Sequence, residues 1–251
     1  MSRTLHAHLA EAPFTLGMSS GFFGFFAHAG MLAALDEAGH RPCGFAGSSA
    51  GALVAGLAAA GMEPARIVDE LATLSRAEFW DPAPGPGFLR GAKFRARLGA
   101  MLSVTRIEEC ARPLVVSTFD VRRRRTHVLA RGPIVPAIYA SCAVPGLFHA
   151  IRHDDRWLVD GGVLDRPGLD GVVPGTRVLH HHLASRSPWR RPGDPALVPP
   201  RRPGLVSLVL SDLPRSGPFR LDAGRDAMAR ARESTLRALD RPIVDASVVL
   251  P

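Results

Sequence analysis

Residues 43–61 read CGFAGSSAGALVAGLAAAG, and this stretch decides the fold. A short apolar run from Cys43 to Ala46 leads into Gly47-Ser48-Ser49-Ala50-Gly51, and an apolar segment then continues from Ala52 to Gly61. This order predicts a strand, a tight turn and a helix. A serine on such a turn stands at a helix N-terminus, where unpaired N–H groups favour developing negative charge. Ser49 is therefore a candidate nucleophile, although a turn of small residues that only lets a helix pack closely on a sheet has the same pattern.

The composition is that of an ordinary globular protein. The chain has 251 residues, of which 46% are hydrophobic and 22% charged, enough for one large domain or two small ones. The formal net charge is +8, and Lys93 is the only lysine. Such an arginine skew can follow from genome base composition, and no nucleic-acid motif accompanies it. We expect no nucleic-acid partner, and attraction to anionic membrane surfaces stays a minor alternative.

Cysteine usage and the N-terminus bear on the compartment. Cys43, Cys110 and Cys142 stand at unrelated spacings, which predicts reduced, partly buried thiols rather than a disulfide framework or a metal site. Residues 2–13 lack the basic-then-apolar layout of a secretory signal. Residues 14–35 are apolar enough to suggest a membrane span, but their glycines and serines fit a strand, a loop and a helix better. We expect a cytoplasmic protein.

Strands and helices alternate along the whole chain, which predicts a single α/β domain built on a layered sheet. We expect strands over residues 14–18, 43–46, 114–118, 126–129, 157–159, 177–183, 205–210 and 243–250. We expect helices over residues 26–38, 52–60, 64–74, 94–102, 133–143 and 222–240, and loops over residues 80–91 and 186–203.

Four consecutive arginines, residues 122–125, fall on a charged turn between two strands. A solvated hairpin tip is the common interpretation of such a run, and contact with lipid headgroups is the alternative.

A serine nucleophile needs a base and donors for the oxyanion. Ser20 to Gly24 form a glycine-containing loop that can turn backbone N–H groups toward Ser49, unless it is only a connection. Asp160 ends an apolar strand and precedes two glycines, so it is a candidate base, although Asp-Gly is also common hairpin-turn chemistry. His180, His181 and His182 follow Asp160, as a Ser-Asp-His triad requires. His180 and His182 share one face of a strand, but packed or surface histidines are the more common case.

Taken together, these pieces resemble the patatin-like lipid acyl hydrolases, or patatin-like phospholipases. The resemblance rests on the loop and helix of residues 19–39, the turn of residues 47–53, Ala140-Ser-Cys-Ala-Val-Pro-Gly-Leu-Phe148, and Val159-Asp160-Gly161-Gly162-Val163. It implies a three-layer α/β/α fold over residues 13–251, after a leader of residues 1–12. It also implies a Ser-Asp dyad without a catalytic histidine or a cofactor, in which Ser49 attacks a lipid or other carboxylic ester and Asp160 is the base.

One departure from the family pattern concerns the oxyanion loop. The family usually carries three successive glycines and then an arginine there, whereas this chain has Ser19-Ser20-Gly21-Phe22-Phe23-Gly24. Losing glycines removes easy access to positive φ. We assign the donors to Ser20, Gly21 and Phe22, and a non-catalytic lipid- or partner-binding protein of the same fold is the alternative function. The phenylalanines at positions 22, 23, 25 and 26 can line an acyl pocket or pack in the core.

Overall fold

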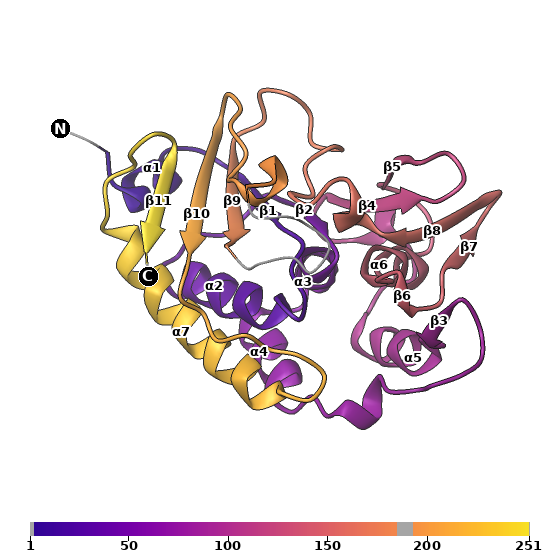
Figure 1. The fold of residues 1–251 in the computed structure, drawn as a ribbon. Helices are drawn as coiled ribbons and strands as arrows, with labels where there is room; N and C mark the ends of the chain where they lie inside the picture. Colours follow the sequence, from indigo (N-terminus) through magenta and orange to yellow (C-terminus); the bar gives the residue numbers. More distant parts are fainter. Residues whose placement is uncertain (1–2, 185–192, 251) are drawn as a thin grey trace.

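The computed structural model describes residues 3–184 and 193–250, and a nine-stranded sheet forms its centre (Figure 1). The strands are β1 (Thr15–Met18), β2 (Gly44–Ser48), β3 (Gly87–Leu89), β4 (Leu114–Asp120), β5 (Arg125–Leu129), β6 (Gly146–Phe148), β7 (Ile151–His153), β8 (Arg156–Asp160), β9 (Val178–Leu183), β10 (Leu205–Leu210) and β11 (Ser247–Leu250). The helices are α1 (Leu5–Glu11), α2 (Phe25–Glu37), α3 (Ala50–Ala59), α4 (Pro64–Ala72), α5 (Ala92–Met101), α6 (Ile134–Cys142) and α7 (Leu221–Leu239), with short 3-10 turns η1 (Arg76–Glu78), η2 (Ile107–Glu109), η3 (Gly161–Val163) and η4 (Pro195–Leu197).

The order of the strands brings the candidate residues to one edge of the sheet. The order is β11-β10-β9-β1-β2-β4-β8-β7, with β5 also paired to β4, and β3 and β6 form a separate pair. The run from β11 to β4 is parallel, whereas β8 is antiparallel to β4. Ser48 lies opposite Ser117, and Thr118 lies opposite Asp160. The residue after β2 therefore meets the last residue of β8 across β4.

The two faces of the sheet are covered differently. Successive residues of β2, such as Phe45 and Ala46, point to opposite faces. Phe45 belongs to the main core, together with the buried residues of α2, α3, α6 and α7. Ala46 belongs to a smaller apolar cluster with Leu169, Val172, Val178 and Leu205. Helices thus cover one face, and the irregular chain after η3 packs on the other.

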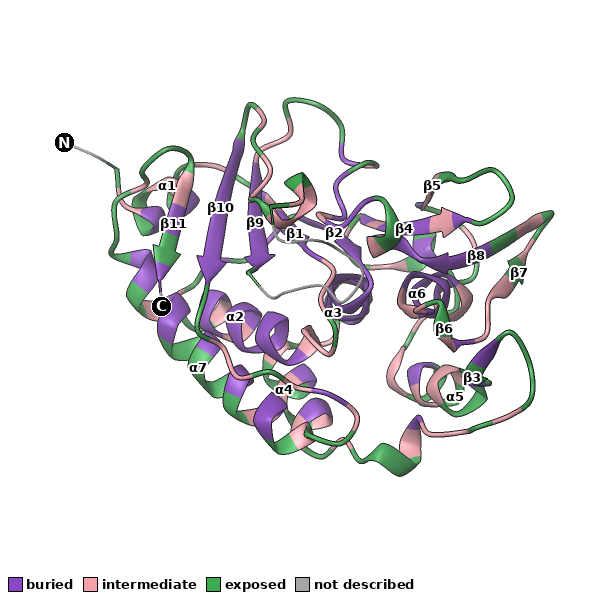
Figure 2. Ribbon diagram, in the orientation of Figure 1, coloured by how far each residue is buried: buried purple, intermediate pink, exposed green. Residues whose placement is uncertain are grey.

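The long C-terminal helix α7 packs against α2 at very short range. A Cβ on Gly30 would lie 2.0 Å from the Met228 carbonyl oxygen, so only glycine fits at this crossing. Met228, Ala231 and Leu239 are buried as expected, and Leu236 is partly buried. Figure 2 shows the buried residues gathered on the sheet and the inward faces of the helices, with the outer face of α7 exposed.

The predicted α/β architecture with a mainly parallel sheet is confirmed, and most element boundaries agree within a few residues. Four elements were not predicted. The expected loop of residues 80–91 contains β3. The strands β6 and β7 are each only three residues long, and the expected leader contains α1. Leu5 and Leu9 of α1 are buried in the main core. The predicted loop of residues 186–203 lies partly outside the described residues, and its described part contains η4.

The arginine run, the cysteines and the possible membrane span considered above can now be placed in the structure. In the β4–β5 hairpin, Arg122, Arg124 and Arg125 are exposed, while Arg123 pairs with Asp120 and Asp155. Cys43, just before β2, is an exposed free thiol, and the other two cysteines are half-buried and free. Among the described residues, no helix combines the length and apolarity that a membrane span requires.

Candidate active site

Ser49 occupies the turn between β2 and α3, in the predicted order of strand, turn and helix. Its φ is 53° and its ψ −120°, a conformation that is costly for any residue other than glycine. The flanking glycines are needed for space. A Cβ on Gly47 would lie 2.5 Å from the Gly51 carbonyl carbon, and one on Gly51 would lie 2.1 Å from the Met18 carbonyl oxygen. The motif therefore lets α3 start directly against β1.

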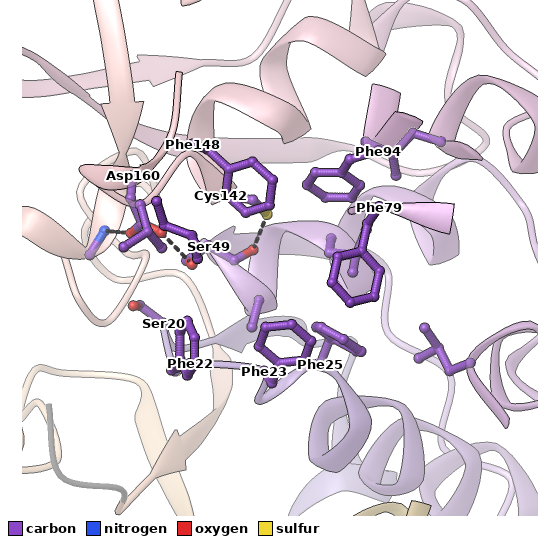
Figure 3. A pocket seen from close by; sticks show the side chains of 18 of the residues that line it. Ser20, Phe22, Phe23, Phe25, Ser49, Phe79, Phe94, Cys142, Phe148 and Asp160 are labelled. Atoms are coloured by element: carbon purple, nitrogen blue, oxygen red, sulfur yellow. Dashed lines mark hydrogen bonds between the residues drawn. The ribbon is translucent and has the colours of Figure 1, made fainter. Parts of the chain in front are cut away.

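Ser49 and Asp160 meet in the way the sheet order requires. The Ser49 hydroxyl donates a hydrogen bond of 2.6 Å to Asp160 Oδ2 (Figure 3). The other carboxylate oxygen, Oδ1, accepts from the Gly162 N–H at 2.7 Å, at the start of η3. Both side chains are nearly buried, with 7% of Ser49 and 5% of Asp160 exposed. The carboxylate is thus held against the serine with one oxygen fixed by the backbone.

The environment of Asp160 makes this carboxyl group more basic than usual. Burial raises the pKa of Asp160 to about 6, although the hydrogen bonds from Ser49 and Gly162 oppose the shift. A carboxylate with this pKa can accept a proton near neutral pH more readily than an exposed one.

Two residues of α6 hold the Ser49 backbone, and the sequence alone assigned them no role. The Ser49 N–H donates to Ser141 Oγ at 2.8 Å, and the Ser141 hydroxyl in turn donates to the Ser117 carbonyl at 2.6 Å. The Cys142 thiol donates to the Ser49 carbonyl at 3.1 Å, and burial raises the pKa of this thiol well above its usual range. Both belong to the Ala-Ser-x-Ala-x-Pro-Gly segment, whose place next to Ser49 becomes visible only in three dimensions.

The loop after β1 borders the site, but one of its three predicted donors is occupied. The Ser20 N–H donates to the Arg166 carbonyl at 2.7 Å, so it is not available to an oxyanion in this conformation. The N–H groups of Gly21 and Phe22 have no partner within residues 3–184 and 193–250. Phe23, not a glycine, carries the positive φ of the loop, at 55°. Of the three predicted donors, the N–H groups of Gly21 and Phe22 therefore remain open in this conformation.

An apolar cavity of about 460 Å³ opens beside Ser49. Phe22, Phe23 and Phe25 line it as one of the two sequence readings expected, whereas Phe26 is fully buried in the core. Figure 3 shows Phe79, Phe94 and Phe148 on the other walls. The remaining apolar lining comes mainly from α3, α4 and α5, namely Leu53, Leu57, Leu71, Leu98 and Met101.

The three consecutive histidines of β9 are engaged elsewhere. The Nε2 atoms of His180 and His182 lie 3.1 Å from the carbonyls of Pro167 and Leu197 respectively. His181 Nδ1 lies 2.8 Å from His28 Nδ1. Burial lowers the pKa of His180 to about 3 and that of His182 to about 4. No histidine of the described chain lines the cavity or hydrogen bonds to Ser49 or Asp160.

The described part of the chain also has no group of three or more His, Cys, Asp or Glu side chains placed to hold a metal ion. Besides Ser49 and Asp160, the polar side chains that line the cavity are those of Ser20, Glu70, Glu78, Arg97, Cys142, Arg166 and Asp194.

Comparison with known proteins identifies the family. The family model described as patatin-like phospholipase matches residues 16–173, which is more than half of the chain and includes Ser49, Ser141 and Asp160. The chain belongs to the patatin-like phospholipase family. An uncharacterized NTE family protein of Mycobacterium tuberculosis is 35% identical to this patatin-like protein over 153 residues, 60% of this chain and 42% of the relative. A second one from the same organism is 26% identical over 166 residues, 64% of this chain and 28% of the relative.

The patatin-like chain thus spans less than half the length of these curated relatives. Among solved structures, VipD from Legionella pneumophila superposes with a TM-score of 0.55 at 15% identity, covering 91% of this chain and 67% of that one. This likeness supports the patatin fold.

Proposed function

We propose that this patatin-like protein is a serine acyl hydrolase that cleaves lipid or other carboxylic esters by a Ser49–Asp160 dyad. The single observation that carries the proposal is the 2.6 Å hydrogen bond from the Ser49 hydroxyl to a buried carboxylate. Membership of the patatin-like phospholipase family and the apolar cavity beside Ser49 support a lipid or ester substrate. The proposal requires no cofactor and no nucleic acid.

The proposed reaction has two stages. Ser49 Oγ attacks the ester carbonyl while its proton passes to Asp160, and the oxygen of the tetrahedral intermediate becomes negatively charged. When the intermediate collapses, the ester C–O bond breaks and Asp160 returns the proton to the departing alcohol. Water then attacks the acyl-Ser49, again with Asp160 as base, which releases the carboxylic acid and restores the serine.

Two backbone groups are proposed to stabilise the oxyanion. The N–H groups of Gly21 and Phe22 border the cavity and have no partner in the described residues, so they can donate to a negatively charged oxygen. The acyl chain would lie in the cavity among the phenylalanines, where burial of its methylene groups contributes to binding.

The first prediction tests the nucleophile and the base. Hydrolysis of p-nitrophenyl esters should fall by about 10³-fold or more in Ser49→Ala and Asp160→Asn. Ser48→Ala is the matched control, because Ser48 is the neighbouring serine and its buried hydroxyl has no partner within the described chain. Its rate should stay close to that of the unmodified protein. Equal rates in all four proteins would refute the dyad.

Two alternatives give different results in the same assay. Under a Ser-Asp-His mechanism, replacing His180, His181 and His182 would abolish activity in a folded protein, whereas the dyad predicts that activity survives. A non-catalytic member of the fold, to which the altered oxyanion loop points, would leave Ser49 unlabelled by a fluorophosphonate probe.

A further inference from the structure

Three aromatic side chains from separate segments form an exposed cluster. The ring of Trp80 lies 5.6 Å from that of Phe88 and 5.2 Å from that of Phe219. The Arg76 guanidinium lies 4.8 Å from the Phe219 ring and 5.6 Å from the Trp80 ring. Phe88 is 52% exposed and Phe219 is 69% exposed. We call Arg76, Trp80, Phe88 and Phe219 the aromatic–arginine patch.

The patch joins two regions that are far apart in the sequence. Arg76, Trp80 and Phe88 lie between α4 and α5, whereas Phe219 lies in the segment that enters α7 (Figure 1). Exposed aromatic residues that gather in this way usually mark a binding surface, because isolated apolar residues are common on a surface but clusters are not. None of the four side chains lines the cavity.

The patch continues into the wall of the cavity. Phe79 lines the cavity and directly precedes Trp80, and its ring lies 5.7 Å from that of Phe23, a second lining residue. On the other side, Phe22 lines the cavity with 49% of its surface exposed, and a Cβ on Gly217 would lie 3.9 Å from its ring. Each of the two segments that carry the patch therefore reaches the cavity wall, one through Phe79 and the other through Gly217 beside Phe22.

The two segments that carry these rings also carry further arginines. Arg90, Arg215 and Arg220 are exposed on the same two segments, and neither they nor Arg76 forms an ion pair with a carboxylate of residues 3–184 or 193–250. Among the nearby acids, Asp81 accepts three backbone N–H bonds and Glu78 pairs with Arg97, which leaves Asp212 and Asp222 exposed against four arginines.

We propose that the aromatic–arginine patch docks the protein on the surface of an anionic lipid bilayer. Tryptophan and phenylalanine rings insert at the boundary between headgroups and acyl chains, and unpaired arginines bind lipid phosphates. The excess of arginines favours an anionic lipid surface over a neutral protein surface. If the proposed ester hydrolysis is also correct, the docked patch places the cavity next to its substrate.

Vesicle binding tests the patch independently of catalysis. The Ser49→Ala protein is mixed with vesicles of phosphatidylcholine, with or without phosphatidylglycerol, and the bound fraction is measured by co-sedimentation. Binding to the anionic vesicles should fall by about tenfold or more in Phe88→Ser/Phe219→Ser, and by about fivefold or more in Arg76→Glu. Arg122→Glu/Arg124→Glu at the hairpin tip and Val173→Ser, exposed elsewhere, are the matched controls, and they should bind like the parent.

Several outcomes would overturn the proposal. The proposal fails if the Ser49→Ala parent does not bind anionic vesicles, or if the patch variants bind as well as the parent. It also fails if only the hairpin-tip variant loses vesicle binding. A shift in oligomeric state on size-exclusion chromatography without a change in vesicle binding would assign the patch to contact between copies. With Ser49 restored, Phe88→Ser/Phe219→Ser should hydrolyse a soluble short-chain ester at the rate of the unmodified protein, which shows that the fold is intact. Absence of hydrolysis by the unmodified protein would refute the proposed function and leave the vesicle result valid.

Discussion

Ser49 is held in its strained conformation by the hydroxyl of Ser141. A positive φ costs a non-glycine residue about 1–3 kcal/mol, so the surrounding contacts must compensate. The Ser141 hydroxyl accepts from the Ser49 N–H and is itself fixed by the Ser117 carbonyl. Ser141 thus sets the position of the nucleophile without touching the substrate.

Ser141→Ala should lower kcat by about ten- to a hundredfold and leave KM nearly unchanged. The substitution leaves the Ser49 N–H buried without an acceptor, which costs about 1–3 kcal/mol and displaces the serine. Steady-state kinetics with a soluble ester and the rate of fluorophosphonate labelling measure the effect. Ser48→Ala, which also deletes a buried hydroxyl, is the control. A normal labelling rate in Ser141→Ala would contradict the positioning role.

The pKa of Asp160 predicts the pH dependence of the reaction. Because burial raises this pKa to about 6, the carboxylate becomes protonated, and unable to act as base, as the pH falls through that value. We expect kcat/KM to be constant above about pH 7 and to fall tenfold per pH unit well below pH 6. The pH profile of a soluble ester substrate tests this. If kcat/KM fell only near the ordinary aspartate pKa, the result would argue against Asp160 as the base. The same would hold if the fall near pH 6 disappeared when the β9 histidines were replaced.

Single residues differ in how far the sequence could predict them. Ser49 and Asp160 follow from short motifs, because the local turn and strand end place each of them. The role of Ser141 depends on α6 packing beside β2 and β4, and no local pattern encodes that contact. The sequence could not indicate that the Ser20 N–H is occupied, because its partner, the Arg166 carbonyl, comes from a segment far away in the sequence.

At the scale of the elements, α3 forms one wall of the cavity along its length. Leu53 and Leu57 follow Ser49 by one and two turns and both line the cavity. Eight residues of helix span about 12 Å, so Leu57 lies along the path that an acyl chain attached to Ser49 would take. The length of chain that fits should depend on the size of this side chain.

Leu57→Phe should shift the preference toward shorter esters. The larger ring fills part of the far end of the cavity, so hydrolysis of a p-nitrophenyl palmitate should fall at least about tenfold while that of a butyrate stays within about twofold. The butyrate rate is the internal control for folding. An equal loss for both esters would indicate general overpacking instead of a chain-length limit.

The elements themselves show which sequence signals are reliable. Long periodic segments such as α7 and the apolar run of β10 were predicted because their pattern repeats over many residues. β6 and β7 have too few residues to show alternation, and β3 stands within a proline- and glycine-rich stretch typical of loops. These short strands are defined by the strands with which they pair: β3 pairs with β6, and β7 pairs with β8.

At the scale of the whole molecule, α1 joins the N-terminus to the C-terminal part of the chain. Leu5 and Leu9 are buried in the main core, and the Leu5 N–H donates to the Arg241 carbonyl at 3.0 Å. The segment looked like a polar leader because its histidines and Glu11 interrupt the apolar pattern, and only the packed chain reveals that its two leucines share one face.

Deleting residues 1–12 should therefore lower the free energy of unfolding by about 3–5 kcal/mol, since two buried leucines and their hydrogen bonds are lost. Urea unfolding followed by circular dichroism measures the change. Leu5→Ala, with an expected loss of about 2–5 kcal/mol, is the comparison within α1, because it removes one of the two buried side chains and keeps the helix. An unchanged midpoint after the deletion would show that residues 13–251 fold without α1.

The exposed thiol of Cys43 gives this molecule a ready chemical handle. It stands at the amino end of β2, and Ser49 follows the opposite end of that strand, so the six residue steps from Cys43 to Ser49 separate a label from the catalytic edge by about 20 Å. The thiols of Cys110 and Cys142 have pKa values raised by burial, which slows their reaction with maleimides. A fluorophore attached here would report which way the protein faces when it meets a surface, without any cysteine having to be introduced.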